Sequence, residues 1–186
     1  MSQSSEKLQS LQGKTALVTG ASGGIGRAVA LELARQGAWV FAHGNSNGRA
    51  LEKLVSDAAG QGADVEFLLC DLSDNAAQDH MLEEIQRRKG SVDILINCAG
   101  VDILTGTTVS QTFEEKLEQL LLIDVKATIR LSRLVGEQMK TVGKGGSIVN
   151  IGWDGAARGM AGDSAQLFAA AKGAVEAFSR CLAQTL

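Results

Sequence analysis

Short apolar runs alternate with segments of helical periodicity along this chain, and the alternation restricts the fold more than any other feature. Each run is four to six residues long, as in strands that helices cover on both faces of a parallel sheet. The runs are residues 14–19, 39–42, 65–70, 92–97 and 147–151. The helical segments are 25–36, 47–59, 74–88 (with Ser73 or Asp74 as its N-cap), 112–140 and 163–185. Together they predict βαβ units with right-handed crossovers.

Length and composition exclude several classes of protein. The 186 residues suffice for one domain, and a net charge of −3 is not that of a nucleic-acid binder. No apolar run reaches the roughly 18 to 20 residues of a membrane helix. The polar residues 1–12 do not form a secretory signal, and Cys70, Cys98 and Cys181 lack metal-binding spacing. We expect one cytoplasmic domain over 1–186, flexible over 1–11, with no metal, nucleic-acid or membrane partner.

A glycine-rich segment, residues 19–26 (TGASGGIG), joins the first predicted strand to the first predicted helix. Gly20 allows a tight turn, Gly24 lets the backbone approach a phosphate, and Gly26 lets the helix pack closely. The free N–H groups at the helix N-terminus attract an anion, and the Ser22 hydroxyl adds a donor. The context of strand, glycine loop and helix predicts a site for the phosphates of a dinucleotide.

Further motifs follow this loop in order, and with them the chain resembles the short-chain dehydrogenase/reductase family. They are Asp71-Leu72 after the third run, residues 97–100 (NCAG) after the fourth, residues 146–151 (GSIVNI) at the fifth, and residues 172–174 (KGA). The spacing T-G-x-x-x-G-x-G differs from the common G-x-G-x-x-G pattern and is typical of this family. Within the family the chain is most similar to the 3-oxoacyl-carrier-protein reductases.

The resemblance implies a doubly wound α/β fold. Its parallel, Rossmann-like sheet has the strand order 3-2-1-4-5. The family continues into a sixth and a seventh strand, which residues 1–186 lack. Two interpretations are open: a naturally short protein, and a fragment of a longer reductase. If nothing follows residue 186, the helix over 163–185 should expose Phe168, Val175, Phe178 and Leu182. We expect homo-oligomers formed through the 112–140 and 163–185 helices.

The resemblance also implies a nicotinamide dinucleotide, NADP(H) or NAD(H), as cofactor. No acidic residue follows the second run to bind a ribose hydroxyl and repel a 2′-phosphate. Asn45 and Ser46, with Arg49 or His43 as the cation, favour NADP(H), although Gly23 stands where NADP-preferring members often carry a basic residue. The expected cofactor-binding residues are Gly20, Ser22, Gly24, Ile25, Gly26, Asn45, Ser46, Asp71, Leu72, Asn97, Ala99, Gly100 and Lys172.

Three of the four catalytic positions that the resemblance implies are altered. In the family a tyrosine protonates the carbonyl oxygen, and a lysine four residues later lowers the pKa of its phenol. A serine donates a second hydrogen bond, and an asparagine holds a water molecule. The corresponding residues here are Phe168, Lys172, Trp153 and Asp124, and the chain contains no tyrosine. Loss of a positioned general acid costs about 10² to 10⁴ in rate, and loss of an oxyanion donor about 10² to 10³.

Asp124 lies on the apolar stripe of its predicted helix, so its carboxylate needs a partner there. The family geometry favours an ion pair or a water bridge to Lys172 over a partly solvated aspartate at a helix kink. Asp154 and Asp163 are candidates for a substitute acid, but ordinary loop and N-cap roles fit them better.

Three functions remain open at this point. The first is a dinucleotide-binding member with little or no carbonyl reduction, acting as a sensor or an oligomer partner. The second is an active oxidoreductase with a substitute proton donor from Trp153, Asp124, Asp154 or water. The third is a fragment of a longer reductase. The residues therefore do not decide whether the chain is an enzyme.

Overall fold

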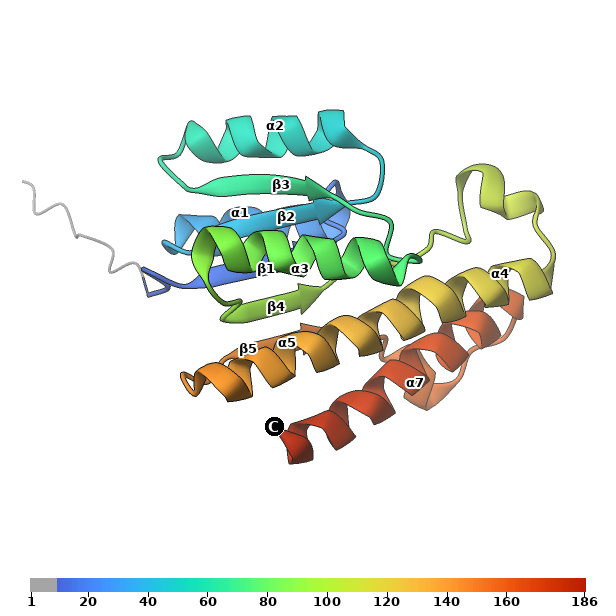
Figure 1. The fold of residues 1–186 in the computed structure, drawn as a ribbon. Coiled ribbons are helices and arrows are strands. Elements are labelled where there is room, and N and C mark those ends of the chain that lie inside the picture. The colour runs from blue at the N-terminus through green and yellow to red at the C-terminus, as the bar shows by residue number, and fades with distance from the viewer. Residues whose placement is uncertain (1–9) are drawn as a thin grey trace, which may run out of the picture.

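Five parallel strands form a single sheet in the order β3-β2-β1-β4-β5, as predicted (Figure 1). The computed structural model describes residues 10–186. The strands are β1 (Thr15–Thr19), β2 (Trp39–Gly44), β3 (Val65–Leu69), β4 (Ile94–Asn97) and β5 (Ser147–Asn150). All five residues of β1 are buried, because this strand has a neighbour on each side and helices on both faces.

Helices cover both faces of the sheet. They are α1 (Gly24–Arg35), α2 (Gly48–Ala59), α3 (Asn75–Lys89), α4 (Phe113–Leu120), α5 (Thr128–Val142), the short α6 (Gly155–Arg158) and α7 (Asp163–Thr185). A 3-10 helix, η1 (Gly106–Ser110), precedes α4. Among the described residues, no helix combines the length and the apolar character needed to cross a membrane.

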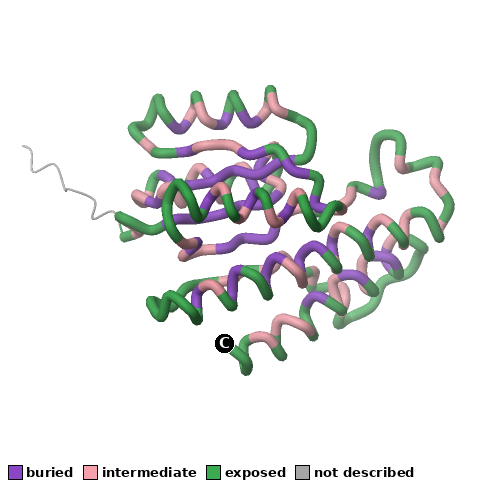
Figure 2. The backbone as a smooth tube through the Cα atoms, viewed as in Figure 1, coloured by how far each residue is buried: buried purple, intermediate pink, exposed green. Residues whose placement is uncertain are grey.

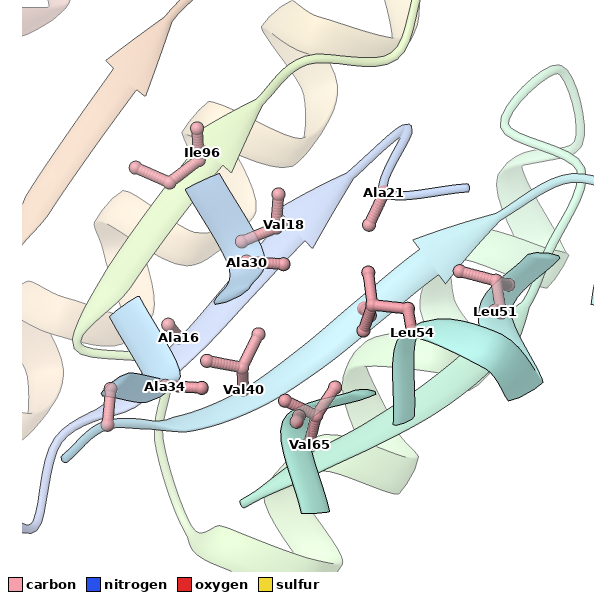
Figure 3. Packing of buried hydrophobic residues seen from close by; sticks show 13 residues of the cluster. Ala16, Val18, Ala21, Ala30, Ala34, Val40, Leu51, Leu54, Val65 and Ile96 are labelled. Atoms are coloured by element: carbon pink, nitrogen blue, oxygen red, sulfur yellow. The ribbon is translucent and has the colours of Figure 1, made fainter. Parts of the chain in front are cut away.

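Alternate residues of each strand point to opposite faces, so the sheet separates two apolar cores. Ala16 and Val18 of β1 pack with α1 and α2 in the core drawn in Figure 3, which contains many alanines. Leu17 of β1 points the other way and packs with α3 and α5. A third cluster of Ile103, Leu120, Leu167 and Ala171 joins α4 to α7, and Figure 2 shows buried positions alternating with more exposed ones along α7.

The predicted helix over 112–140 is interrupted in the structure. A π-helical segment, η2 (Leu121–Ala127), separates α4 from α5 and carries Asp124 near its middle. A π-helical turn inserts a residue into the helix and so changes the direction of the side chains around it. The periodicity of apolar residues indicates a helix but does not reveal this change. Helices η1 and α6 were not predicted, because both are too short to show a periodic pattern.

Two expectations concern the ends of the chain; the flexible segment over 1–11 stays a prediction, and the exposure of Val175 needs correction. Residues 1–9 of the predicted flexible tail lie outside the described residues. Leu11, however, packs against the core, and its N–H donates to the carbonyl of Gln36 at 3.0 Å. Val175 was expected to be exposed on α7 but is buried, because this face of the helix lies against β5, where Asn150 donates to Ser179. Phe168, Phe178 and Leu182 are partly exposed.

The close packing of α1 on the loop after β1 predicts a large difference between two glycines. A Cβ added to Gly26 would lie 2.8 Å from the carbonyl carbon of Gly20, whereas one on Gly23 would meet no atom within 4 Å. Gly26→Ala should therefore lower the free energy of unfolding by about 1–3 kcal/mol, and Gly23→Ala should change it by less than about 0.5 kcal/mol. Urea unfolding of the two variants measures both, and equal effects would contradict this packing.

Candidate functional site

A cleft of about 900 Å³ opens at the carboxyl ends of the strands. Most of the predicted cofactor-binding residues line it, from the loops after β1, β2, β3 and β4: Gly20, Ser22, Gly24, Ile25, Gly26, Asn45, Asp71, Leu72, Ala99 and Gly100. Its remaining lining is Gly23, His43, Gly44, Cys98, Val101, Asp102 and Ile123. In a doubly wound sheet, the crevice outside the strand ends is where ligands bind.

The loops after β1 and β4 are held together at the bottom of the cleft. Thr19, the last residue of β1, accepts the N–H groups of Cys98 and Ala99 with its hydroxyl, each at 3.1 Å. Gly20 has a φ of +67°, and a Cβ there would lie 2.8 Å from the backbone of Ala99. Only glycine suits both the conformation and the space. The role of Thr19 was not predicted, because it depends on β1 and β4 being neighbours.

The N-terminus of α1 at the cleft is open to an anion. No side chain caps it, and its first turn contains no acidic residue. A Cβ built on Gly24, the first residue of the helix, would meet no protein atom within 4 Å. The free N–H groups and the partial positive charge of the helix can therefore reach a phosphate group without obstruction.

His43 connects the end of β2 to the loops on either side of it. Its Nε2 lies 2.8 Å from the carbonyl oxygen of Cys70, so Nε2 carries the proton, and Nδ1 accepts a long bond of 3.5 Å from the N–H of Gly20. Burial lowers the pKa of His43, opposed in part by the bond to Cys70 and by the charge of Asp71. The neutral imidazole thus supports the glycine loop from below. The sequence pattern did not indicate this role.

The charged side chains that line the cleft are acidic. The described lining residues include Asp71 and Asp102 but no lysine or arginine. The pKa of Asp102 is lowered by a hydrogen bond from the Thr105 hydroxyl and by the N–H groups of Leu104 and Thr105. At the β2 end, Asn45 lines the cleft, whereas Ser46 and Arg49 are exposed just outside it.

The predicted ion pair between Asp124 and Lys172 is present. The Lys172 Nζ lies 2.9 Å from Asp124 Oδ2, with side-chain exposures of 15% and 2%. Asp124 Oδ1 also accepts the N–H of Val101 at 2.8 Å. A Cβ on Gly100 would lie 2.8 Å from Oδ2, so the carboxylate occupies the space beside this glycine. The pair therefore joins η2, α7 and the loop after β4 directly behind the cleft wall.

Two aromatic rings occupy the region of the expected serine and tyrosine. The centroids of Trp153 and Phe168 lie 6.3 Å apart with a tilt of 60°. The ring of Trp153 lies over Gly155, where an added Cβ would come within 2.7 Å of Cη2. Phe168 packs on the cluster between α4 and α7. Neither ring carries an ionisable proton, so this region offers apolar surface and one indole N–H.

The remaining predicted residues have local partners. The amide nitrogen of Asn97 donates to Ser132 at 3.1 Å and to Asn150 at 2.8 Å, so Asn97 binds β4 to α5 and β5 behind the cleft. Its part in cofactor binding stays a prediction. Asp154 is exposed and pairs with Arg158, and Asp163 is the first residue of α7, after the N-cap Gly162.

Comparisons with known proteins agree with this geometry. Residues 14–186 match the profile of a family described as short chain dehydrogenase. A 2,3-dihydro-2,3-dihydroxybenzoate dehydrogenase of Bacillus subtilis is 36% identical over 172 residues, which are 92% of this chain and 64% of that protein. A 3-oxoacyl-[acyl-carrier-protein] reductase of Pseudomonas aeruginosa is 38% identical over 175 residues, 94% of this chain and 68% of the reductase. The chain thus spans about two thirds of the length of these relatives.

A solved structure has the same fold. The crystal structure of a short chain dehydrogenase from Burkholderia cenocepacia, in complex with NADP, superposes with a TM-score of 0.83 and 31% sequence identity. The match covers 95% of this chain and 70% of that one.

The buried His43 predicts a loss of stability in mild acid. Below its ordinary pKa of 6.5, the histidine binds a proton in the unfolded chain but resists it in the folded one. Stability should therefore fall as the pH drops below 6.5, by up to about 2 kcal/mol at pH 5 from this group alone. Urea unfolding at pH 5 and pH 7.5 should show a smaller difference for His43→Gln than for the unchanged protein.

His80→Gln is the matched control, because the His80 side chain is 81% exposed and pairs with Glu83 one turn along the same helix. It should keep the pH dependence of the unchanged chain. If His43→Gln kept it too, the neutral buried imidazole would be refuted.

Proposed function

Because the chain belongs to the short-chain dehydrogenase family, we propose that its cleft binds a nicotinamide dinucleotide and that carbonyl reduction at this site is weak or absent. The observation that carries the first part is the uncapped N-terminus of α1, which faces a cleft of about 900 Å³. Its first residue is Gly24, where an added Cβ would meet no protein atom within 4 Å. A cleft of this size is in the range of ligand and cofactor sites.

The cleft residues divide among the parts of such a ligand. The first N–H groups of α1 and the Ser22 hydroxyl bind the pyrophosphate. Asp71 and Leu72, at the end of β3, contact the adenine. Ala99 and Gly100 form the wall beside the nicotinamide. Lys172 lies behind this wall with 15% of its side chain exposed, and we assign it to the adjacent ribose. When bound, the dinucleotide supplies or accepts a hydride.

The second part of the proposal rests on what surrounds Lys172. Phe168 and Trp153 place two rings where a proton donor and an oxyanion donor would be needed. The nearby carboxylates are poor substitutes, because Asp124 pairs with Lys172 and Asp154 with Arg158, and an ionised carboxylate accepts hydrogen bonds without donating them. The role that fits these residues best is a dinucleotide sensor or an oligomer partner.

We also propose a preference for NADP(H) and self-association. Asn45 lies in the cleft where an acidic residue would repel a 2′-phosphate, and Arg49 is exposed in the first turn of α2, which follows it. For association, η2 carries exposed Leu121 and Leu122, and α5 carries exposed Leu134. We propose that these exposed leucines are buried against a second copy, together with the partly exposed apolar residues of α7.

Titration of the protein with NADH and NADPH, followed by their fluorescence, tests the binding site. Both should bind, NADPH more tightly. Gly24→Asn should weaken both at least about tenfold, because a side chain would fill the phosphate position. Gly62→Asn is the matched control. Gly62 also has a positive φ and open space, but it does not line the cleft. Absence of binding by both nucleotides would refute the proposed function.

Reductase assays with an acetoacetyl thioester and a simple ketone test the chemistry. The unchanged chain should turn over slowly if at all. Phe168→Tyr with Trp153→Ser should raise the rate at least about tenfold, by supplying the missing donors. Adding Asp124→Asn should raise it further, because Lys172 is then free to act on the phenol. If the unchanged chain reduces these substrates rapidly and the double substitution lowers the rate, the proposal that carbonyl reduction is weak or absent is refuted.

A further inference from the structure

The charged groups near the Gly100 end of the cleft carry more negative than positive charge. Lys172 is partly buried there, but Asp124 lies 2.9 Å from its Nζ and cancels its charge. Asp102 adds a negative charge on the cleft lining, and its lowered pKa keeps it ionised. No lysine or arginine is among the described residues of the lining. This end of the cleft therefore has no uncompensated cation and one carboxylate in excess.

The Asp124 carboxylate is close enough to the cleft to affect a ligand. Its Oδ1 accepts the N–H of Val101 at 2.8 Å, and its Oδ2 lies where a Gly100 side chain would be. Gly100 and Val101 both line the cleft, so only one layer of backbone separates the carboxylate from it. Since Asp124 is 2% exposed, water and salt screen its charge poorly.

We propose that Asp124 determines which oxidation state of the dinucleotide the cleft prefers, and that it favours the oxidised form. The inference rests on the proposed function, which places the nicotinamide beside Gly100. The two oxidation states differ there by one charge, because the oxidised ring is a pyridinium cation and the reduced ring is neutral. A lone Lys172 ammonium would repel the cation, whereas the neutral pair with Asp124 does not.

Charge and hydrogen bonding by Asp124 can be separated. An asparagine has the same shape, and its Oδ1 can still accept the N–H of Val101, but it has no charge to offer Lys172. A purely structural role would therefore survive Asp124→Asn or weaken both oxidation states equally. A role through charge changes the ratio of the two dissociation constants.

Isothermal titration calorimetry with oxidised and reduced NADP and NAD measures this ratio without any catalytic step. The unchanged chain should bind the oxidised form at least as tightly as the reduced form. Asp124→Asn should weaken the oxidised form relative to the reduced one by about tenfold. Lys172→Met should shift the ratio in the opposite direction, because it leaves the Asp124 carboxylate without its cation. Circular dichroism confirms that each variant is folded.

Asp79→Asn is the matched control. It also removes a carboxylate from an ion pair, with Arg130 at 2.7 Å. Arg130 is not a cleft residue, whereas Asp124 accepts the N–H of Val101, which lines the cleft. The ratio for Asp79→Asn should equal that of the unchanged chain. If both oxidation states bind and Asp124→Asn leaves their ratio unchanged, the inference is wrong although the proposed function stands. If Asp124→Asn does not fold, a Lys172→Met ratio equal to that of the unchanged chain refutes it. If neither form binds the unchanged chain, the proposed function itself fails.

Discussion

The loops that follow β1 and β4 leave the sheet toward opposite faces, and the candidate site depends on this divergence. The loop after β1 leads to α1 on one face, whereas the loop after β4 leads toward α5 on the other. Between them a cleft must open, because neither loop can fill the space at the strand ends. The hydroxyl of Thr19 and the missing side chain of Gly20 hold the two loops together at its base.

Behind this cleft, the differences from the expected catalytic residues are consistent with one another. Where a phenol and a hydroxyl are absent, the rings of Trp153 and Phe168 fill the region with apolar surface. Where a lysine remains, an aspartate stands beside it, so its charge is not left buried without a partner. A chain that had merely lost single groups would leave an unpaired cation or a cavity. These residues instead form a packed and electrically balanced site.

Much of this could be predicted from the sequence, because the relevant signals are local. The five apolar runs, the glycine spacing over 19–26 and the motifs after the strands are read residue by residue. They carry the family resemblance, and that resemblance implied the observed strand order. The π-helical turn at Asp124, the support of the glycine loop by His43 and the burial of Val175 could not be read in this way. Each of these depends on contacts between segments far apart in the chain, such as the approach of Cys70 to His43.

The sequence by itself determined the kind of fold, the place of the phosphate loop and the loss of the phenol, since a chain without tyrosine cannot supply one anywhere. The tertiary structure alone decided how the remaining groups combine. Asp124 and Lys172 are 48 positions apart in the chain. Only the packing of α7 against η2 brings them to 2.9 Å, with the Asp124 side chain 2% exposed and that of Lys172 15% exposed. The strength of a charge depends on its surroundings, and those surroundings are formed only when the chain folds.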